Sequence, residues 1–334
     1  MVVEGQEGPQ SLVCQDVEQP QPGPGQVLVR MYAHALNYRD LVILAGGYPH
    51  NDTRPVRPVS DGAGEVVAVG AGVDGVQPGD RVMAHLSPHW LAGELTTAAY
   101  ARLLGGGMDG TLAEYCVFEA HGVVSIPAHL RYEEAATLPC AALTAWEALI
   151  RRGQLAPGQT VLLLGTGGVS LFGLQFAKMA GAGVIITSKS NEKLQKARAL
   201  GADGCVNYAE TPDWDVEVRT LTHGRGVDHV LETGGGGTLE KSIRACAFNG
   251  QISLVGVLTG LAATASPLGA ILSALRLQGI YVASRAAFEA MNRAIEHRQL
   301  RPVIDRVFPF EEAAAAYEYF ASAQHFGKVV ISHQ

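Results

Sequence analysis

The stretch Val161-Leu162-Leu163-Leu164-Gly165-Thr166-Gly167-Gly168-Val169-Ser170 decides the fold of this chain. Its four leading apolar residues predict a strand that is buried on both faces, as strands of parallel sheets are. After the glycines, apolar side chains recur at spacings of three and four, which predicts a helix with a stripe made by Val169, Phe172, Phe176 and Met179. The stretch therefore predicts a strand, a tight turn and a helix in direct succession.

The turn in this stretch has the spacing of a dinucleotide-binding motif. Gly165 allows the tight turn, and Gly167 lets the backbone approach a pyrophosphate at the helix N-terminus. Ser170 stands at the third motif position instead of glycine, and it still permits close packing of the helix on the sheet. A glycine-rich turn without a ligand is the alternative, but the flanking strand and helix favour the motif. The residues expected to hold the dinucleotide here are Gly165, Thr166, Gly167, Gly168 and Val169.

Strands and helices keep alternating after this motif. Residues 184–187 form the next expected strand, and residues 190–200 form a helix that Gly201 can end. The expected strands that follow cover residues 205–208, 227–231 and 252–257. Such alternation predicts a parallel, doubly wound sheet, so the fold class is α/β.

The first 125 or so residues follow another pattern. Short candidate strands are separated by Gly and Pro turns, which predicts a barrel-like β domain. Residues 86–110 form a longer, partly helical excursion from it. The chain ends with an expected strand at 303–308, a helix at 311–321 and a strand at 328–331. With 334 residues in total, two domains are expected.

Composition and charge exclude several classes of protein. Hydrophobic residues make up 47% and charged residues 17%, which is typical of a globular chain. The net charge is −7 and no block of Lys or Arg stands out, so neither nucleic acid nor a membrane surface is an expected partner. We find no signal peptide and no apolar run long enough to span a bilayer. The five cysteines are far apart and no C-x-x-C pair occurs, so we expect a reduced, cytoplasmic chain without a four-Cys zinc site.

The end of the second predicted strand of the sheet bears on the choice of cofactor. Sites that prefer NAD usually carry an acidic residue about 20 positions after the glycines, where it binds the ribose hydroxyls. The segment 187–193 (TSKSNEK) has no carboxylate at the end of the strand and offers Ser188, Lys189 and Lys193 instead. These groups would bind a 2′-phosphate, so the segment predicts NADPH. The alternative is that both lysines are ordinary solvated residues of a helix.

Several further motifs, in their order along the chain, resemble the medium-chain dehydrogenase/reductase superfamily, and the resemblance covers nearly the whole chain. They are residues 35–40 (ALNYRD), 61–66 (DGAGEV), 78–82 (PGDRV), 143–146 (LTAW), 201–203 (GAD) and 326–330 (FGKVV). The resemblance implies a GroES-like β-barrel catalytic domain at 1–127, a Rossmann NADPH-binding domain at 128–267, and a return to the catalytic domain at 268–334.

Zinc-dependent members of this superfamily carry ligands that this chain lacks. Asn37 stands where they have a ligand cysteine, and Ser60-Asp61 stands where they have His-Glu. Cys140 matches the third ligand of some zinc enzymes, but one soft ligand cannot make the usual three-ligand catalytic site. We therefore expect no metal. The alternative is a metal site with an unusual set of ligands drawn from His34, His85, His89 and Asp61. Cys140 could instead be a small buried residue beside the cofactor.

The remaining features resemble the zinc-free quinone oxidoreductase and enoyl reductase branch. That resemblance implies hydride transfer from NADPH to an activated C=C bond or quinone of a small molecule. It implies Tyr48 as proton donor, Asn37 as hydrogen-bond donor to the substrate carbonyl, and Thr144 beside the nicotinamide. The further residues expected to border the cofactor are Tyr208, Val255, Val257 and Lys328.

Each of these assignments leaves an alternative open. Tyr48 could be an aromatic lid residue, Asn37 could bind only backbone, and Lys328 could be a surface lysine. The rival functions are a dehydrogenase for a small alcohol or aldehyde and a non-catalytic NADPH-binding protein. A homodimer is expected from the family, with strand 252–257 as the candidate sheet edge or, alternatively, an internal strand.

Overall fold

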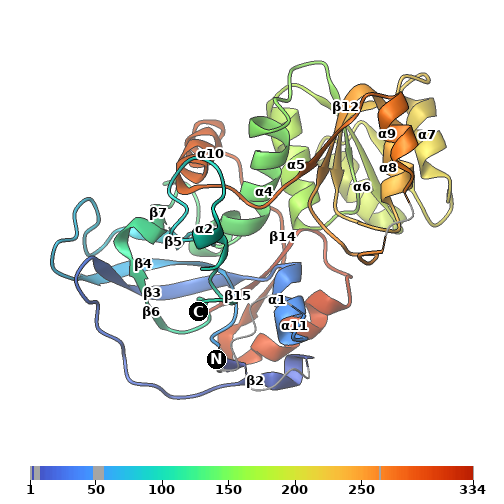
Figure 1. Cartoon of the computed structure of the whole chain (residues 1–334). Helices are drawn as coiled ribbons and strands as arrows, with labels where there is room; N and C mark the ends of the chain where they lie inside the picture. Colours follow the sequence, from blue (N-terminus) through green and yellow to red (C-terminus); the bar gives the residue numbers. More distant parts are fainter. Residues whose placement is uncertain (1, 4–7, 48–55, 263–264, 334) are drawn as a thin grey trace. The chain divides into compact units, whose positions relative to one another are not determined.

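The computed structural model describes residues 2–3, 8–47, 56–262 and 265–333 (Figure 1). The chain divides into two compact units. The first unit comprises residues 1–143 and 283–334, and the second unit comprises residues 144–282. The sequence placed the changes of domain after residues 127 and 267, and those domain boundaries stay predictions.

The second unit is built on a six-stranded parallel sheet with helices packed along it (Figure 1). Its strands are β8 (Thr160–Leu163), β9 (Gly183–Ser188), β10 (Gly204–Asn207), β11 (Val227–Glu232), β12 (Cys246–Leu254) and β13 (Arg276–Gly279). Its helices are α4 (Leu143–Trp146, which begins at the last residue of the first unit), α5 (Gly168–Met179), α6 (Asn191–Ala199), α7 (Trp214–Leu221), α8 (Leu239–Ala245) and α9 (Pro267–Leu272), with a π-helical segment at Glu147–Arg151. The predicted doubly wound sheet is confirmed.

The strand order of this sheet is β10-β9-β8-β11-β12-β13. The chain runs outward from β8 to β10, and then returns to build β11, β12 and β13 on the other side of β8. The strand order therefore reverses between β8 and β11, and open α/β sheets bind ligands at such a point, beyond the carboxyl ends of the strands. One core cluster of the unit includes Leu162, Ile185, Val230 and Ile252, one side chain from each of the four central strands.

The sequence prediction for strand 252–257 was wrong in its bounds and in its use as a sheet edge. β12 ends at Leu254 and pairs with β11 on one side and β13 on the other. The edge strand next to β12 is β13, which lies in the segment that the sequence assigned to the return to the catalytic domain. Its residues Arg-Leu-Gln-Gly carry no apolar run, so the hydrophobic pattern gave no signal for a strand there.

The first unit holds a seven-stranded sheet of mainly antiparallel strands in the order β14-β15-β3-β4-β5-β7, with β6 paired to β3. These strands are β3 (Gln26–Ala35), β4 (Asp61–Val69), β5 (Arg81–Ala84), β6 (Tyr115–Glu119), β7 (Val123–Ser125), β14 (Ile304–Pro309) and β15 (Lys328–Ser332). Within the described residues this order has two ends and no pairing that closes a barrel. The last two strands, β14 and β15, return to the sheet of the first unit, as predicted.

Helices of 4 to 14 residues complete the first unit. They are α1 (Tyr38–Leu44), α2 (Thr97–Tyr100), α3 (Tyr132–Ala135), α10 (Arg285–Arg298), α11 (Ala313–Ala321) and a π-helical segment at Leu138–Ala142. Strands β1 (Val2–Val3) and β2 (Leu12–Val13) and short 3-10 turns at Gly8–Ser11, Ala120–Gly122 and Phe310–Glu312 are also present. Among the helices described, none is both long and apolar enough to cross a membrane.

Candidate active site

The glycine turn after β8 has the geometry that its sequence predicted. Gly165 has φ +73°, a left-handed conformation that favours glycine, and Ser170 Oγ donates to the Leu164 carbonyl at 2.7 Å. Helix α5 begins at Gly168, and a Cβ added at Gly167 would meet no atom within 4 Å. The first turn of a helix leaves backbone N–H groups without an acceptor in the helix. The open space at Gly167 therefore lies beside a group of donors suited to a phosphate.

The residues predicted to bind the adenosine side of a cofactor lie at the same edge of the sheet. Gly165 N donates to Thr187 Oγ1 at 3.2 Å, and Tyr208 N donates to the Ser188 carbonyl at 3.1 Å. Ser188 is buried, Lys189 is exposed, and Lys193 lies in the first turn of α6. The structure thus gathers the ends of β8, β9 and β10 on one side of the glycine turn.

The ends of β11 and β12 lie on the other side of that turn. Thr233 Oγ1 donates to the Leu164 carbonyl at 2.8 Å, which ties the end of β11 to the end of β8. Val255 N donates to the Glu232 carbonyl at 2.9 Å, and Val257 is partly exposed just beyond. Thr144, the first residue of the unit, is buried in α4.

The first unit contains a buried cluster of charged and polar side chains around Asn37. Lys328 Nζ is buried and donates to Asn37 Oδ1 at 2.7 Å and to the Leu36 carbonyl at 2.5 Å. The Asn37 amide also bonds to the Asp61 carboxylate, and its Nδ2 lies 3.4 Å from the Ala35 carbonyl. Lys328 is thus not a surface lysine, and its ammonium group is bound inside the first unit. Its role in cofactor binding stays a prediction.

Asp61 is held by several donors in this cluster. Ser60 Oγ donates to Asp61 Oδ1 at 2.9 Å, and the backbone N–H of Cys140 donates to Asp61 Oδ2 at 3.1 Å. Burial raises the pKa of Asp61 and lowers the pKa of Lys328, while the attraction between the two charges opposes both shifts. Burial also raises the pKa of the Cys140 thiol to about 12, so the thiol is protonated at neutral pH.

Asp40 adds a second buried carboxylate close to the cluster. Its Oδ2 accepts from Asn37 N at 2.7 Å and so caps α1. Burial raises the pKa of Asp40 to about 6, although the neighbouring Arg39 guanidinium opposes the shift. The Asp40 carboxyl therefore titrates within the physiological range instead of far below it.

This donor set does not fit the catalytic zinc of the zinc-dependent relatives. Asn37 supplies a neutral amide, Asp61 already has several hydrogen-bond donors, and the Lys328 ammonium brings a positive charge to the same place. Of the candidate histidines, His34 bonds to Thr111 Oγ1 and His333, while His85 bonds to the Ser87 and Ala283 carbonyls. Across the described ranges, no three His, Cys, Asp or Glu side chains come together as a metal site.

Two groups in these regions were missed by the sequence analysis, and one predicted residue is not described. The first missed feature is the electrostatic attraction between the buried Lys328 and Asp61 side chains, and the second is Glu232, a buried carboxylate at the end of β11. The sequence signal for Glu232 was an acidic residue directly after the apolar pair Val230-Leu231 and before Thr-Gly-Gly-Gly-Gly. Tyr48, the predicted proton donor, lies outside the described residues.

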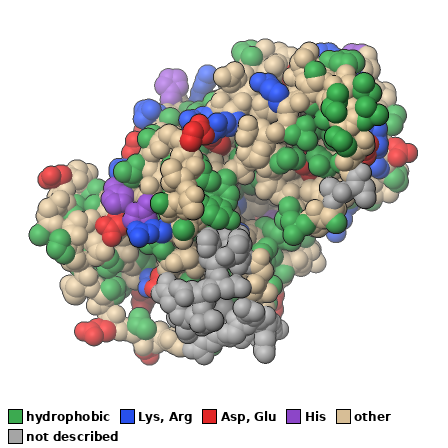
Figure 2. All heavy atoms as spheres, in the orientation of Figure 1, with side chains coloured by type: hydrophobic (Ala, Val, Ile, Leu, Met, Phe, Trp, Pro, Cys, Tyr) green, Lys and Arg blue, Asp and Glu red, His purple; other side chains and the backbone are tan. Residues whose placement is uncertain are grey.

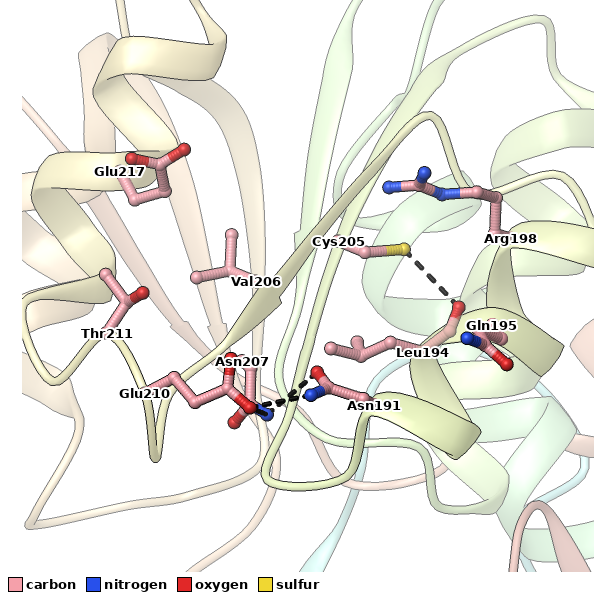
Figure 3. A pocket seen from close by; sticks show the side chains of 10 residues that line it. All are labelled: Asn191, Leu194, Gln195, Arg198, Cys205, Val206, Asn207, Glu210, Thr211 and Glu217. Atoms are coloured by element: carbon pink, nitrogen blue, oxygen red, sulfur yellow. Dashed lines mark hydrogen bonds between the residues drawn. The ribbon is translucent and has the colours of Figure 1, made fainter.

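A surface hollow of about 480 Å³ lies between α6 and α7 beside the edge strand β10 (Figure 3). Asn207 Nδ2 donates to Asn191 Oδ1 and to Glu210 Oε1, both at 2.9 Å, and Cys205 Sγ donates to the Leu194 carbonyl. The residues lining the hollow include none of the predicted cofactor-binding residues. It is therefore separate from the glycine turn.

Comparison with known proteins connects both units to one family. A family described as the alcohol dehydrogenase GroES-like domain matches residues 23–128, and one described as zinc-binding dehydrogenase matches residues 168–297. A zinc-type alcohol dehydrogenase-like protein of Schizosaccharomyces pombe is 45% identical over 95% of this chain and 94% of its own. An acryloyl-coenzyme A reductase of Metallosphaera sedula is 29% identical over 99% of both chains.

Solved structures agree with these matches. An NAD-dependent alcohol dehydrogenase is 36% identical, with a TM-score of 0.91 over 100% of this chain and 99% of its own. A mycobacterial protein complexed with NADPH is 27% identical, with a TM-score of 0.83 over 99% of this chain and 98% of its own. The chain belongs to the medium-chain dehydrogenase/reductase family. It is an oxidoreductase that uses a nicotinamide cofactor, and its relatives differ in which one they bind.

Proposed function

We propose that this protein transfers hydride from NADPH to an activated C=C bond or a quinone of a small molecule, without zinc. The observation that carries the proposal is the buried Asn37–Asp61–Lys328 cluster. Oxidation of an unactivated alcohol benefits from a Lewis acid at its oxygen, whereas reduction of an electron-poor C=C bond needs only hydride, orientation and polar groups. An acryloyl-coenzyme A reductase among the relatives acts, by its name, on a bond of this kind.

The choice of NADPH is supported by the end of β9. No carboxylate stands there to repel a 2′-phosphate, and Ser188, Lys189 and Lys193 offer a hydroxyl and two positive charges. Because one relative is NAD-dependent, NADH is the alternative cofactor. Comparing the dissociation constants of NADPH and NADH for the purified protein decides between them.

After hydride reaches the β-carbon of an enone, negative charge grows on the carbonyl oxygen and the α-carbon requires a proton. Asn37 and Tyr48 are proposed for these two tasks. Asn37 Oδ1 is bound to the Lys328 ammonium, which polarises the amide and strengthens its N–H groups as donors. Its Nδ2 has acceptors in Asp61 and the Ala35 carbonyl, so the bond to Ala35, long at 3.4 Å, is the one that a substrate oxygen would replace.

Activity and metal content test the proposal together. We expect steady consumption of NADPH with members of an enone and quinone panel, zinc well below one atom per chain, and no effect of a chelator. Stoichiometric zinc that is lost together with alcohol oxidation would favour the alcohol dehydrogenase. Tight NADPH binding without turnover on any acceptor would favour the non-catalytic protein.

We also propose a homodimer formed through the second unit. The edge strand β13 carries the exposed Leu277, and α9 exposes Leu268, Ile271 and Leu272. Figure 2 shows hydrophobic side chains gathered on this face of the second unit. Sedimentation at low concentration should show a species near twice 35.2 kDa, and a single monomer-sized species would contradict the dimer.

A further inference from the structure

Glu232 is a fully buried carboxylate that binds its own loop. It ends β11, and its Oε1 accepts from Gly234 N at 2.8 Å, Gly235 N at 3.0 Å and Thr238 Oγ1 at 2.7 Å. Its Oε2 accepts from Ser242 Oγ in α8. A buried carboxylate is stable only when its oxygens are well supplied with donors, and here four donors converge on it.

The loop that Glu232 holds is tied to the loops after both neighbouring strands. Thr259 N donates to the Gly234 carbonyl at 2.7 Å, and Gly236 N donates to the Gly260 carbonyl at 2.9 Å. On the other side, Thr233 Oγ1 reaches the Leu164 carbonyl, at the start of the glycine turn. One carboxylate therefore stands at the centre of a network that joins the loops after β8, β11 and β12.

The two glycine-containing loops also approach too closely for side chains. A Cβ at Gly256 would lie 2.4 Å from the Thr233 carbonyl oxygen, and a Cβ at Gly235 would lie 2.7 Å from Val257 Cα. Gly235 has φ +92°, which side-chain-bearing residues rarely adopt. The backbone of residues 233–238 is thus closely packed against the loop after β12, and its amides at Gly234 and Gly235 donate to the Glu232 carboxylate.

This hydrogen-bond network lies at the edge of the sheet where the cofactor is expected. The strand order reverses between β8 and β11, and the pyrophosphate is expected at the glycine turn between them. The groups suited to the adenosine ribose lie at the ends of β9 and β10, so the nicotinamide half would extend toward β11 and β12. The loop fixed by Glu232 lies on that side.

We propose that Glu232 is a positioning residue that holds the loop 233–238 in the arrangement that receives the nicotinamide half of the cofactor. This inference rests on the proposed binding of NADPH. A preformed loop lowers the entropy that binding must remove, so loss of the carboxylate weakens affinity without touching the ligand. Gln keeps one acceptor oxygen but replaces the other with an amide group that cannot accept from Ser242.

The test compares two probes on Glu232→Gln: NADPH, and adenosine 2′,5′-bisphosphate, which lacks the nicotinamide half. We expect the dissociation constant of NADPH to rise at least about tenfold, as for a lost hydrogen bond to a charged group. The dissociation constant of the bisphosphate should stay within about twofold. The matched control Glu240→Gln, an exposed carboxylate in α8, should change neither value.

A second variant covers the case in which Glu232→Gln does not fold. Thr238→Val removes one hydroxyl donor at nearly constant shape and should change the NADPH-to-bisphosphate ratio in the same direction, by a smaller factor. Equal weakening of both probes, or an unchanged ratio in both variants, would overturn the proposal. Failure of the wild-type protein to bind NADPH would instead contradict the proposed function, and NADH with ADP would then replace the two probes.

Discussion

The carboxyl edge of the second unit and the buried cluster of the first unit bring polar groups together in opposite ways. At the edge, the groups that contact one another are mostly backbone amides, carbonyls and small hydroxyls, and a glycine leaves open space among them. In the cluster, buried side chains from distant parts of the chain bind one another and neighbouring backbone groups. The first arrangement leaves open space that a ligand can fill, whereas the second is held together by its own charges and offers a ligand only the weakly bonded Asn37 amide.

The largest expected effect is a loss of cofactor binding at the carboxyl edge of the second unit that leaves folding unchanged. Gly167→Val should weaken NADPH at least about 100-fold, because a branched Cβ occupies the space that the pyrophosphate needs. The same space is empty in the protein itself, so the melting temperature should change little. Gly279→Val, at another glycine with no atom near its Cβ position, should bind NADPH normally. Tight NADPH binding by Gly167→Val would place the pyrophosphate elsewhere.

The cluster should respond in the opposite sense. Lys328→Met removes a buried ammonium and leaves Asp61 without its opposite charge, which should lower the free energy of unfolding by about 3–5 kcal/mol. Urea unfolding at pH 7 measures this loss. The double variant Lys328→Met with Asp61→Asn should recover much of the stability, because it removes both charges. A single variant as stable as the wild type would show that the stability of the cluster does not depend on the attraction between these two charges.

The glycine turn could be predicted from the sequence, whereas the contacts within the buried cluster could not. The glycine turn is contiguous over ten residues, so its strand, turn and helix could be predicted from local pattern alone. Lys328 and Asn37 are 291 positions apart, and only the folding of β15 against β3 brings them together. The family motifs named both residues but not their contact. β13 was not predicted for a different reason: a four-residue edge strand of mixed polarity has no periodic pattern of hydrophobic residues.

Asp40 extends the comparison to pH, because burial raises the pKa of this carboxyl inside the first unit. The folded pKa of about 6 lies above the usual 3.8, so the folded state binds the proton more tightly than the unfolded chain. Stability from this group is present at low pH and is lost as the pH rises from about 4 to about 6, by up to about 3 kcal/mol. Asp40→Asn should flatten this part of the stability profile. A wild-type profile that rises through the same window would contradict the raised pKa.

The smallest expected effect is a change in cofactor preference at Lys189, directly after the end of β9. Lys189→Glu should weaken NADPH by about 10- to 100-fold, the scale of one charge-assisted contact, and leave NADH nearly unchanged. Lys189→Gln removes the charge without reversing it and should fall between the two. Because Lys189 is exposed, part of its attraction is screened, and the NADPH difference should shrink as salt is added. If wild type and both variants bind NADPH and NADH equally, the end of β9 does not select the 2′-phosphate, and the absence of a carboxylate there has no bearing on cofactor choice.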